Sequence, residues 1–365
     1  MKLIISGGGT GGHVYPAIAI ADAIKKIKPE ADILFVGAEG KLEMEKVPKA
    51  GYPIKGLWIS GFQRKLTIRN LLFPIKLISS LFKAKKIIRK FKPDVAVGVG
   101  GYASGPLLKM AERKNIPTVL QEQNSYPGVT NKLLAKNAHR ICVAYDGMER
   151  FFKKEKIVLT GNPVRAEFFK NLNQKKEEAY NHFGFDKNKI SVFVFGGSLG
   201  ARTINQAMAA SFNSLKNNPE VQVLWQVGKL YLEEYKNSET AKLPTVKTMA
   251  FIDRIDLAYA MADVVIGRAG ALSISELCLV GKPAILIPSP NVAEDHQTKN
   301  ALALVEKNAA VLVHDSEAKE KMMSTAIDLL NDENKKQALA ENIKKLARPN
   351  AAEDIAKEIL NLVSK

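Results

Sequence analysis

Short apolar runs alternate with amphipathic segments along almost the whole chain. In the first half, runs rich in Val, Ile and Leu predict β-strands at 2–6, 32–37, 94–100, 117–123 and 140–145. Residues 14–27 (VYPAIAIADAIKKI) place apolar side chains at helical spacing instead. The alternation returns in the second half, with a helix from about Arg202 and strands at 190–198, 221–228, 245–252, 263–270 and 283–290. Buried strands separated by helices are typical of parallel sheets, so the pattern predicts an α/β protein.

The two series of strands predict two domains. A chain of 365 residues exceeds one ordinary core. The turn-forming sequence TGNP at 160–163 ends the first series. We therefore expect a first domain over 1–161 and a second over 162–345, each Rossmann-like.

Glycine-rich loops follow strands in both halves. Gly7, Gly9 and Gly12 satisfy the pattern G-x-G-x-x-G, and similar loops occur in VGVGGYASGP, VFVFGGSLG and VVIGRAGALS. Such loops let backbone amides approach phosphate oxygens, and the following helix adds N–H groups and a positive dipole end. One loop of this kind also forms for geometric reasons alone, but four of them predict a phosphate-bearing ligand in a cleft between two open sheets, at the carboxyl ends of the strands.

A nicotinamide cofactor is one ligand that this pattern allows. That cofactor requires an acidic residue at the end of the second strand, about 20 residues past the loop, to hold the ribose. Here the second strand ends in Val36, Gly37 and Ala38, and Glu39 comes later than expected. The glycine loops of the second half also remain unexplained, so the sequence disfavours a nicotinamide enzyme.

The positive charge of the chain is concentrated in its first half. The formal net charge is +17, and residues 1–161 hold 28 Lys and Arg against 12 Asp and Glu. Residues 62–92 contain ten basic residues and no acidic residue. Between these charges, apolar side chains lie at helical spacing at Leu77, Ile78, Leu81, Ile88 and Phe91. The segment predicts either a helix for an anionic membrane surface or a packed helix with a solvated basic face. No aromatic platform accompanies the charge, so we expect no nucleic acid partner.

Composition narrows the class of protein. The two cysteines, Cys142 and Cys278, have no metal or redox spacing, which indicates a reduced, cytoplasmic protein. The apolar start MKLIIS is too short for a signal-peptide core, and no stretch reaches the length of a membrane span. We expect no metal site, because the histidines are dispersed and no D-x-D pair occurs.

Several motifs taken together resemble those of the MurG family. In order along the chain they are GGGTGGHVYPAIAIA, GVGGYASGP, QEQNSYPGVTNK, TGNPVR, FGGSLGARTIN, AGALSISEL and EDHQTKNA. The resemblance implies a two-domain GT-B fold in which the last helix, within 346–365, returns to the first domain. It also implies an inverting, metal-independent transfer of GlcNAc from UDP-GlcNAc to the C4 hydroxyl of MurNAc in undecaprenyl-linked lipid I, which makes lipid II for peptidoglycan. No cofactor is implied.

The resemblance also assigns roles to individual residues. It makes His13, at a helix start that favours its neutral form, the catalytic base. It places Glu276 on the ribose diol and Ile252 at the uracil. The other residues implied to bind UDP-GlcNAc are Thr10, Gly11, Gly12, Asn124, Arg165, Ser198, Ala271, Leu272, Ser273, Ile274, Ser275 and Gln297.

One position departs from the family pattern. Several relatives carry His where this chain has Gln121, so a proton-carrying role at that position does not transfer, although a hydrogen-bonding role does. The resemblance places the protein peripherally on the cytoplasmic side of the cell membrane, with cell-wall synthesis and division proteins as partners. A related lipid glycosyltransferase and a non-catalytic sugar-nucleotide-binding protein are the alternatives. Only acceptor assays separate the first from lipid II synthesis, whereas the presence of both His13 and Glu276 argues against the second.

Overall fold

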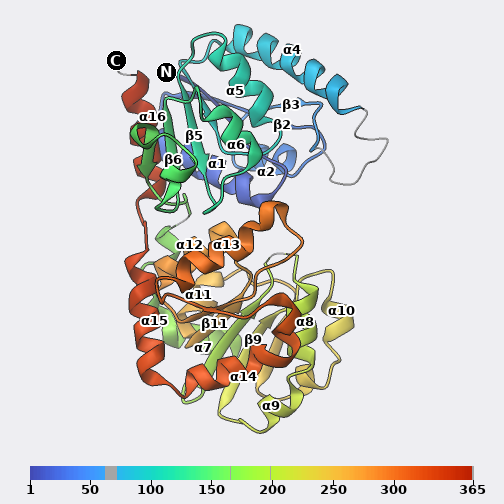
Figure 1. Cartoon of the computed structure of the whole chain (residues 1–365). Helices are drawn as coiled ribbons and strands as arrows, with labels where there is room; N and C mark the ends of the chain where they lie inside the picture. Colours follow the sequence, from blue (N-terminus) through green and yellow to red (C-terminus); the bar gives the residue numbers. More distant parts are fainter. Residues whose placement is uncertain (62–71, 165, 198, 364–365) are drawn as a thin grey trace. The chain divides into compact units, whose positions relative to one another are not determined.

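The computed structural model describes residues 1–61, 72–164, 166–197 and 199–363, which form two compact units. The first unit comprises Met1–Val164 and Arg348–Lys365, and the second comprises Arg165–Ala347. The sequence predicted the first limit after residue 161 and the second before residue 346. The chain thus passes between the units twice, at 164–165 and at 347–348 (Figure 1).

The first unit contains, in its described residues, a seven-stranded parallel sheet in the order β3-β2-β1-β4-β5-β6-β7. Its strands are β1 (Lys2–Ser6), β2 (Asp32–Ala38), β3 (Ile54–Leu57), β4 (Val95–Gly98), β5 (Thr118–Glu122), β6 (Arg140–Val143) and β7 (Ile157–Leu159). Its helices are α1 (Gly11–Ile27), α2 (Glu43–Lys49), α4 (Phe73–Phe91), α5 (Ser104–Glu112), α6 (Val129–Leu134) and α16 (Ala351–Val363), with 3₁₀ turns η1 (Met148–Arg150) and η2 (Lys154–Lys156).

Alternate side chains of these strands fill two cores. Leu3 and Ile5 of β1 face α1 and α16, whereas Ile4 faces α4, α5 and α6. Helix α16 packs along α1 and buries Ile355 and Ile359 there (Figure 1). Both faces of the sheet are covered, which explains why its strands read as continuous apolar runs.

The second unit contains, in the part described, a six-stranded parallel sheet in the order β10-β9-β8-β11-β12-β13. Its strands are β8 (Ile190–Phe195), β9 (Val221–Gln226), β10 (Val246–Met249), β11 (Val264–Gly267), β12 (Ala284–Leu286) and β13 (Val311–Leu312). Its helices are α7 (Lys176–Phe183), α8 (Arg202–Ala209), α9 (Phe212–Lys216), α10 (Leu232–Tyr235), α11 (Ile255–Met261), α12 (Ala271–Val280), α13 (His296–Val305), α14 (Ala318–Leu330) and α15 (Glu333–Lys345). Its 3₁₀ turns are η3 (Ala166–Phe169), η4 (Leu172–Lys175), η5 (Thr240–Lys242), η6 (Ala293–Asp295) and η7 (Asp315–Glu317).

Helices cover both faces of this second sheet as well. Val192 and Val194 of β8 share a core with α8 and α14, while Phe193 packs edge-on against Tyr259 of α11. The prediction of an α/β protein with two Rossmann-like domains is confirmed. The short edge strands β3, β7 and β13 were absent from the sequence prediction, because so few residues carry too little periodicity.

Helix α4 lies within the basic segment predicted over 62–92, of which 62–71 fall outside the described residues. Its apolar face was partly misassigned from the sequence. Ile88 is buried, and Leu77, Leu81 and Phe91 pack against the core, so of the five residues expected between the charges only Ile78 is exposed. The exposed apolar side chains of this helix, with the residue before it, are Leu72, Ile75, Ile78 and Phe82. A hydrophobic period of 3.6 residues predicts the helix, but it does not predict which of two apolar stripes packs against the core.

Candidate active site

Two glycine loops meet at the carboxyl edge of the first sheet. β1 and β4 are neighbours, so the loop after Ser6 adjoins the loop after Gly98. A Cβ at Gly101, whose φ is +85°, would collide with the carbonyl oxygen of Gly8. The Ser104 hydroxyl joins the same two loops, because it lies 2.8 Å from the carbonyl oxygens of Ser6 and of Gly100. The two glycine loops therefore pack against each other and form one continuous surface of backbone groups.

His13 lies on this surface, in the first turn of α1. Its Nδ1 is 3.1 Å from the carbonyl oxygen of Gly8 and 3.4 Å from the hydroxyl of Thr10. A carbonyl oxygen can only accept, so Nδ1 carries the proton of the neutral ring and Nε2 carries the lone pair. The ring stands against the second loop, where a Cβ at Gly100 would lie 2.9 Å from Nε2. This tautomer makes Nε2 the basic atom of the site.

A buried carboxylate that the sequence analysis missed holds the first glycine loop. Glu43 begins α2 and is fully buried. Its Oε2 accepts the N–H of Gly9 at 2.8 Å, and its Oε1 accepts the N–H of Ala38 at the end of β2, also at 2.8 Å. Glu43 stands in the charged sequence KLEMEK, which is typical of an exposed helix, so no local signal separates it from its neighbours.

The QEQN motif at 121–124 begins in the last two residues of β5 and is held by internal hydrogen bonds. The buried carboxylate of Glu122 accepts from the backbone N–H of Asn124 at 3.0 Å and of Gly128 at 3.1 Å, and from Asn131 Nδ2 at 2.8 Å. Burial raises the pKa of Glu122 above its usual value. Asn124 Nδ2 also donates to Glu122 Oε1 at 3.3 Å. Hydrogen bonds to Glu122 therefore hold both the backbone of this loop and the side chain of Asn124.

Gln121 belongs to a buried amide network. Its Nε2 donates to Asn162 Oδ1 at 2.9 Å, while Asn162 Nδ2 donates to the carbonyl oxygen of Gln123 at 3.0 Å. Gln123 in turn donates to the carbonyl oxygen of Val99 at 2.9 Å. Gln121 is fully buried, so this side chain serves as a hydrogen-bonding group of the fold. The network ties residues of the TGNP turn to the glycine loop after β4.

The second unit repeats the arrangement of strand, loop and helix. β8 and β11 are neighbours, and their loops lead into α8 and α12. Two of the predicted ligands, Arg165 and Ser198, lie outside the described residues. Five further residues implied to bind UDP-GlcNAc form the first turn and a half of α12: Ala271, Leu272, Ser273, Ile274 and Ser275. A helix start leaves N–H groups without intrahelical acceptors and carries the positive end of the dipole.

Glu276 follows these residues on α12. The hydroxyl of Tyr259 donates to its Oε2 at 3.5 Å, and Tyr259 itself is fully buried. Burial raises the pKa of Glu276 to about 7, well above that of an exposed glutamate. The carboxyl group therefore changes charge near neutral pH.

Ile252 lies in the loop after β10, and its backbone N–H is already paired. It donates to Gln226 Oε1 at 2.9 Å. Gln297, at the start of α13, accepts the N–H of Ser289 with its Oε1 at 2.8 Å. The Ile252 backbone and the Gln297 side chain, both predicted to contact UDP-GlcNAc, are therefore held in place by hydrogen bonds within the second unit.

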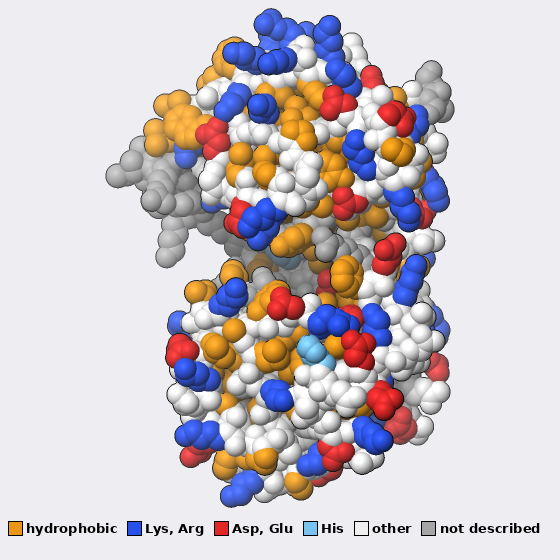
Figure 2. All heavy atoms as spheres, turned by 180° about the vertical axis from the view of Figure 1, so that it is seen from behind, with side chains coloured by type: hydrophobic (Ala, Val, Ile, Leu, Met, Phe, Trp, Pro, Cys, Tyr) orange, Lys and Arg blue, Asp and Glu red, His pale blue; other side chains and the backbone are white. Residues whose placement is uncertain are grey.

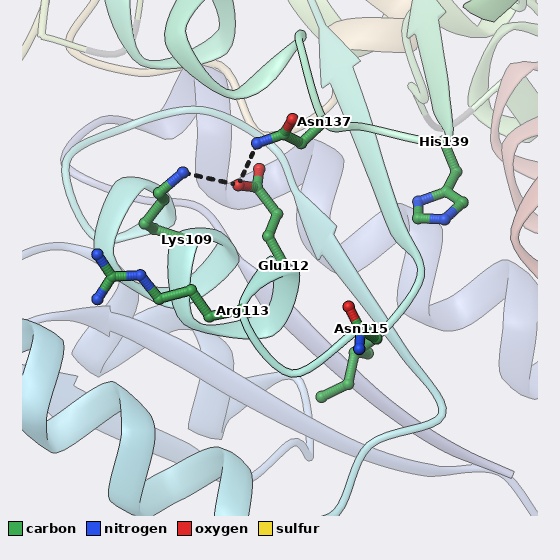
Figure 3. Close-up of a pocket in the computed structure, with 7 residues that line it drawn as sticks. Lys109, Glu112, Arg113, Asn115, Asn137 and His139 are labelled. Carbon is green, nitrogen blue, oxygen red and sulfur yellow. Dashed lines mark hydrogen bonds and ion pairs between the residues drawn. The ribbon is translucent and has the colours of Figure 1, made fainter.

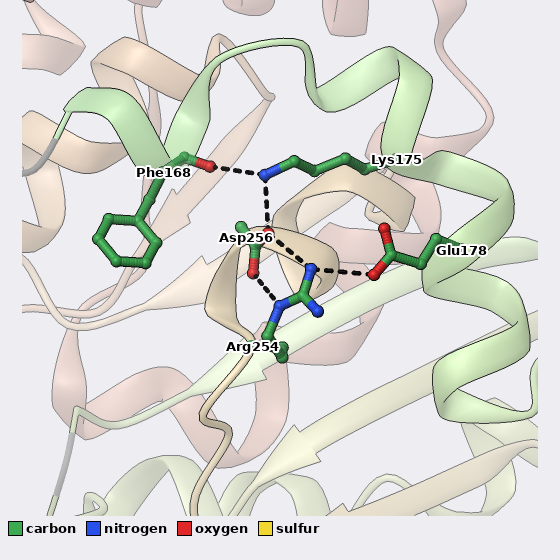
Figure 4. A network of polar contacts seen from close by, with 5 residues as sticks. All are labelled: Phe168, Lys175, Glu178, Arg254 and Asp256. Carbon is green, nitrogen blue, oxygen red and sulfur yellow. Dashed lines mark hydrogen bonds and ion pairs between the residues drawn. The ribbon is translucent and has the colours of Figure 1, made fainter.

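An ionic network holds the far end of the Ile252 loop (Figure 4). The buried carboxylate of Asp256 accepts from Arg254 Nε at 3.0 Å and from Lys175 Nζ at 2.8 Å. Glu178 pairs with the same guanidinium at 3.0 Å. These partners lower the pKa of Asp256 to about 2, although burial acts against them, so its charge persists at neutral pH.

Arg268 lies directly after β11, and its charge is engaged within the second unit. Its guanidinium pairs with Asp315 and donates to the carbonyl oxygen of Ile287 at 3.0 Å. The hydroxyl of Thr203 in α8 donates to the same Asp315 at 3.0 Å. Arg268 therefore links the loop after β11 to the first turn of α8, and its charge is balanced within the unit.

A separate pocket of about 350 Å³ lies in the first unit (Figure 3). Glu112 lies in it and accepts from Lys109 at 3.2 Å and from Asn137 at 3.0 Å. The lining residues end α5 or precede β5 and β6, so the pocket lies at the amino edge of the sheet, opposite the glycine loops. Among the residues described, no group of His, Cys, Asp and Glu could hold a metal ion, and no helix has the length and apolar character needed to cross a membrane.

Comparison with known proteins identifies related chains over the full length. Models of the glycosyltransferase family 28 N-terminal and C-terminal domains match residues 3–143 and 191–359. A relative from Christiangramia forsetii is 54% identical over 100% of this chain and 98% of its own, and one from Bacteroides fragilis is 53% identical over 99% and 96%. Both are named UDP-N-acetylglucosamine–N-acetylmuramyl-(pentapeptide) pyrophosphoryl-undecaprenol N-acetylglucosamine transferase.

Solved structures agree with these matches. MurG of Acinetobacter baumannii is 26% identical, with a TM-score of 0.80 over 99% of both chains. A UDP-GlcNAc 2-epimerase from Neisseria meningitidis is 13% identical, with a TM-score of 0.71 over 99% of this chain and 100% of its own, and shares the fold alone.

Proposed function

Because the chain belongs to the MurG family within glycosyltransferase family 28, we propose that it transfers N-acetylglucosamine from UDP-N-acetylglucosamine to undecaprenyl-pyrophosphoryl-MurNAc-pentapeptide. The observation that carries this function is the full-length identity of 53–55% to transferases of that name. The product is the lipid-linked disaccharide of peptidoglycan synthesis. The glycine loops and helix starts of both units supply the kind of backbone surface that a nucleotide diphosphate needs.

His13 acts as the general base in this proposal. Its Nε2 accepts the proton of the acceptor C4 hydroxyl as that oxygen bonds to the anomeric carbon of the donor. The bond from the anomeric carbon to the diphosphate oxygen breaks, and UDP leaves with the electron pair. A single displacement inverts the α-linked donor to a β-linked product. The bond from Nδ1 to Gly8 supports this role, because it holds the basic nitrogen away from the loop carbonyl.

The second unit binds the donor. Glu276 in its ionised form accepts two hydrogen bonds from the ribose diol, and the start of α12 meets the diphosphate. Ile252 offers its carbonyl oxygen to uracil, since its N–H is held by Gln226. Gln297 has its amide oxygen occupied, so its NH₂ group is the part that meets the sugar. Thr10, Gly11, Gly12, Asn124, Arg165 and Ser198 complete the proposed donor contacts.

The charge that develops on the leaving UDP needs stabilisation. We assign this to the helix starts and Arg165, since Arg268 is paired with Asp315. Catalysis on this basis is independent of added metal and survives a chelator such as EDTA.

Helix α4 docks the protein on the membrane that holds the acceptor. Ile75, Ile78 and Phe82 are 56%, 54% and 69% exposed and share one face of the helix. Figure 2 shows Lys and Arg side chains gathered over the end of the first unit that carries α4, beside hydrophobic ones. Apolar side chains flanked by cations suit an anionic leaflet, and we place the protein peripherally on the cytoplasmic face. Proteins of cell-wall synthesis and division are the partners expected there.

A transfer assay tests the proposed function. Purified protein is incubated with radiolabelled UDP-GlcNAc and a short-chain lipid I analogue, with EDTA present and absent. Lipid-linked label in both reactions is the expected result. Transfer of label to diacylglycerol, supplied in a parallel reaction, and not to the lipid I analogue would contradict the proposed acceptor.

A further inference from the structure

Gln226 joins two loops of the second unit through one side-chain amide. It is the last residue of β9 and is 4% exposed. Its Nε2 donates to the carbonyl oxygen of Gly197 at 3.0 Å, and its Oε1 accepts the N–H of Ile252 at 2.9 Å. Both ends of the amide are therefore satisfied, each by the backbone of a different loop.

The strand order explains why this residue reaches both loops. β9 lies between β8 and β10 in the sheet. Gly197 belongs to the loop after β8, and Ile252 belongs to the loop after β10. All three strands are parallel, so their carboxyl ends lie at one edge, and a side chain at the end of the middle strand can touch both neighbouring loops.

The rest of each loop is held independently of Gln226. A Cβ at Gly200 would collide with the carbonyl oxygen of Val227, and Gly228 packs directly against Gly200, so these backbones are in contact. The Arg254–Asp256 pair fixes the far end of the Ile252 loop. The backbone N–H of Gly200 also donates to the Gly197 carbonyl oxygen at 3.1 Å, and Gln226 adds a side-chain bridge from that carbonyl to the Ile252 backbone.

We propose that Gln226 is a positioning residue for the nucleotide, one that fixes the glycine loop after β8 relative to the loop that presents Ile252. This rests on the proposed function, in which the loop after β8 contributes Ser198 to the donor contacts and Ile252 meets the uracil. A nucleoside diphosphate spans both, so its affinity depends on their spacing, whereas the proton transfer at His13 does not. The residue acts through the two backbones and touches no reacting atom.

The chemistry of the amide makes the role testable. The Gly197 end requires a donor and the Ile252 end requires an acceptor. Methionine has a similar volume and supplies neither. A protonated glutamic acid supplies both, and an ionised glutamate only accepts, so it turns an oxygen toward the Gly197 carbonyl. Burial raises the pKa of such a glutamate, which brings its titration into the range of measurement.

The experiment is calorimetric titration of the full chain with UDP from pH 6.5 to 9, for wild type, Gln226→Met and Gln226→Glu. Affinity of the methionine variant should fall about tenfold at every pH, the effect expected when displaced loops lose about one hydrogen bond to the nucleotide. Each value is divided by that of wild type at the same pH, which removes the titration of Glu276. The glutamate variant should approach wild type at low pH and lose affinity as pH rises.

Gln222→Met is the matched control. Gln222 lies at the other end of β9, is 2% exposed, and uses its amide in the same way, donating to Asp186 O at 2.7 Å and accepting its N–H at 3.1 Å. It joins no glycine loop. Its variant should lose thermal stability comparably but bind UDP within about twofold of wild type. At saturating donor, kcat of both Gln226 variants should stay within about threefold, with the change confined to KM.

The outcomes separate the two proposals. Wild-type protein that does not bind UDP overturns the proposed donor site, and this role with it. Wild type that binds, with Gln226→Met equal to it or no worse than Gln222→Met, overturns the positioning role alone. Loss of affinity in Gln226→Glu without pH dependence also overturns it, since packing alone has that result. If the methionine variant does not fold, the pH series of the glutamate variant decides.

Discussion

The imidazole of His13 donates from Nδ1 to the carbonyl oxygen of Gly8, 3.1 Å away. The glycine loop therefore selects the tautomer whose lone pair is on Nε2. His13→Ala should lower kcat by about 10²–10⁴-fold, the usual contribution of a general base, and leave UDP affinity nearly unchanged. Steady-state kinetics with a lipid I analogue and calorimetry with UDP measure the two effects. An alanine variant that keeps full turnover would rule out His13 as the base.

UDP binding should weaken in acid because of Glu276. Burial raises the pKa of this carboxyl to about 7, and only its ionised form accepts two hydrogen bonds from the ribose. Below that pH, UDP affinity should fall by up to about tenfold per pH unit. The Glu276→Gln variant should bind more weakly at pH 8, and its affinity should not show this step. A step of equal size in both proteins would assign it to another group.

The same pKa predicts a gain in stability for Glu276→Gln. The folded pKa lies above the value of about 4.5 expected in the unfolded chain, so the folded protein holds the proton more tightly. That contribution is complete below pH 4.5 and is lost as pH rises through 7. Without ligand, the variant should therefore melt at a higher temperature than wild type at pH 8 and at a similar temperature near pH 4.5. Calorimetric melting across this range measures the difference.

Glu43→Gln should damage the first glycine loop. Both carboxylate oxygens accept backbone N–H groups, so an amide nitrogen in place of one oxygen faces a donor. A buried N–H left unpaired costs about 1–3 kcal/mol of unfolding free energy, and we expect kcat to fall as well, because the loop carries His13. Glu45→Gln is the control, since Glu45 is exposed on the same helix and should change stability by less than about 0.5 kcal/mol. Urea unfolding compares the two; equal losses would contradict the role of Glu43.

Vesicle binding should depend on both chemical features of α4. Replacing Ile75, Ile78 and Phe82 by Ser removes the exposed apolar face, and replacing Lys83, Lys85, Lys86 and Lys90 by Glu reverses its charge. Each set of substitutions should abolish flotation with anionic vesicles, and binding of wild type should weaken as salt rises above about 0.15 M.

Lys83 already pairs with Glu39 at 2.6 Å, so it contributes least of the four lysines to vesicle binding. Leu230→Ser, at an exposed site of the second unit, is the control. Binding that ignores lipid charge and both sets of substitutions would show that α4 is only a packed helix.

Sequence reasoning succeeded for elements whose formation depends on their own segment. The longer strands, the glycine loops and the helices that carry His13 and Glu276 follow from local pattern. It failed for Glu43 and Gln226, whose partners lie in other segments: Glu43 contacts Gly9, and Gln226 contacts Gly197 and Ile252. Nothing in the neighbouring residues marks such groups, because their role arises only when parallel strands bring distant loops to one edge.

The amide network of Gln121, Gln123 and Asn162 has a mechanical consequence. It fastens the chain to the first unit up to Asn162, two residues before that unit ends. Gly161, with φ of +87°, packs so closely on the returning segment that a Cβ there would collide with Arg348. The segment that contains Gly161 and the segment that begins at Arg348 therefore lie side by side within the first unit. The last helix, α16, is thus attached to the first unit at its starting end as well as through its packing on α1.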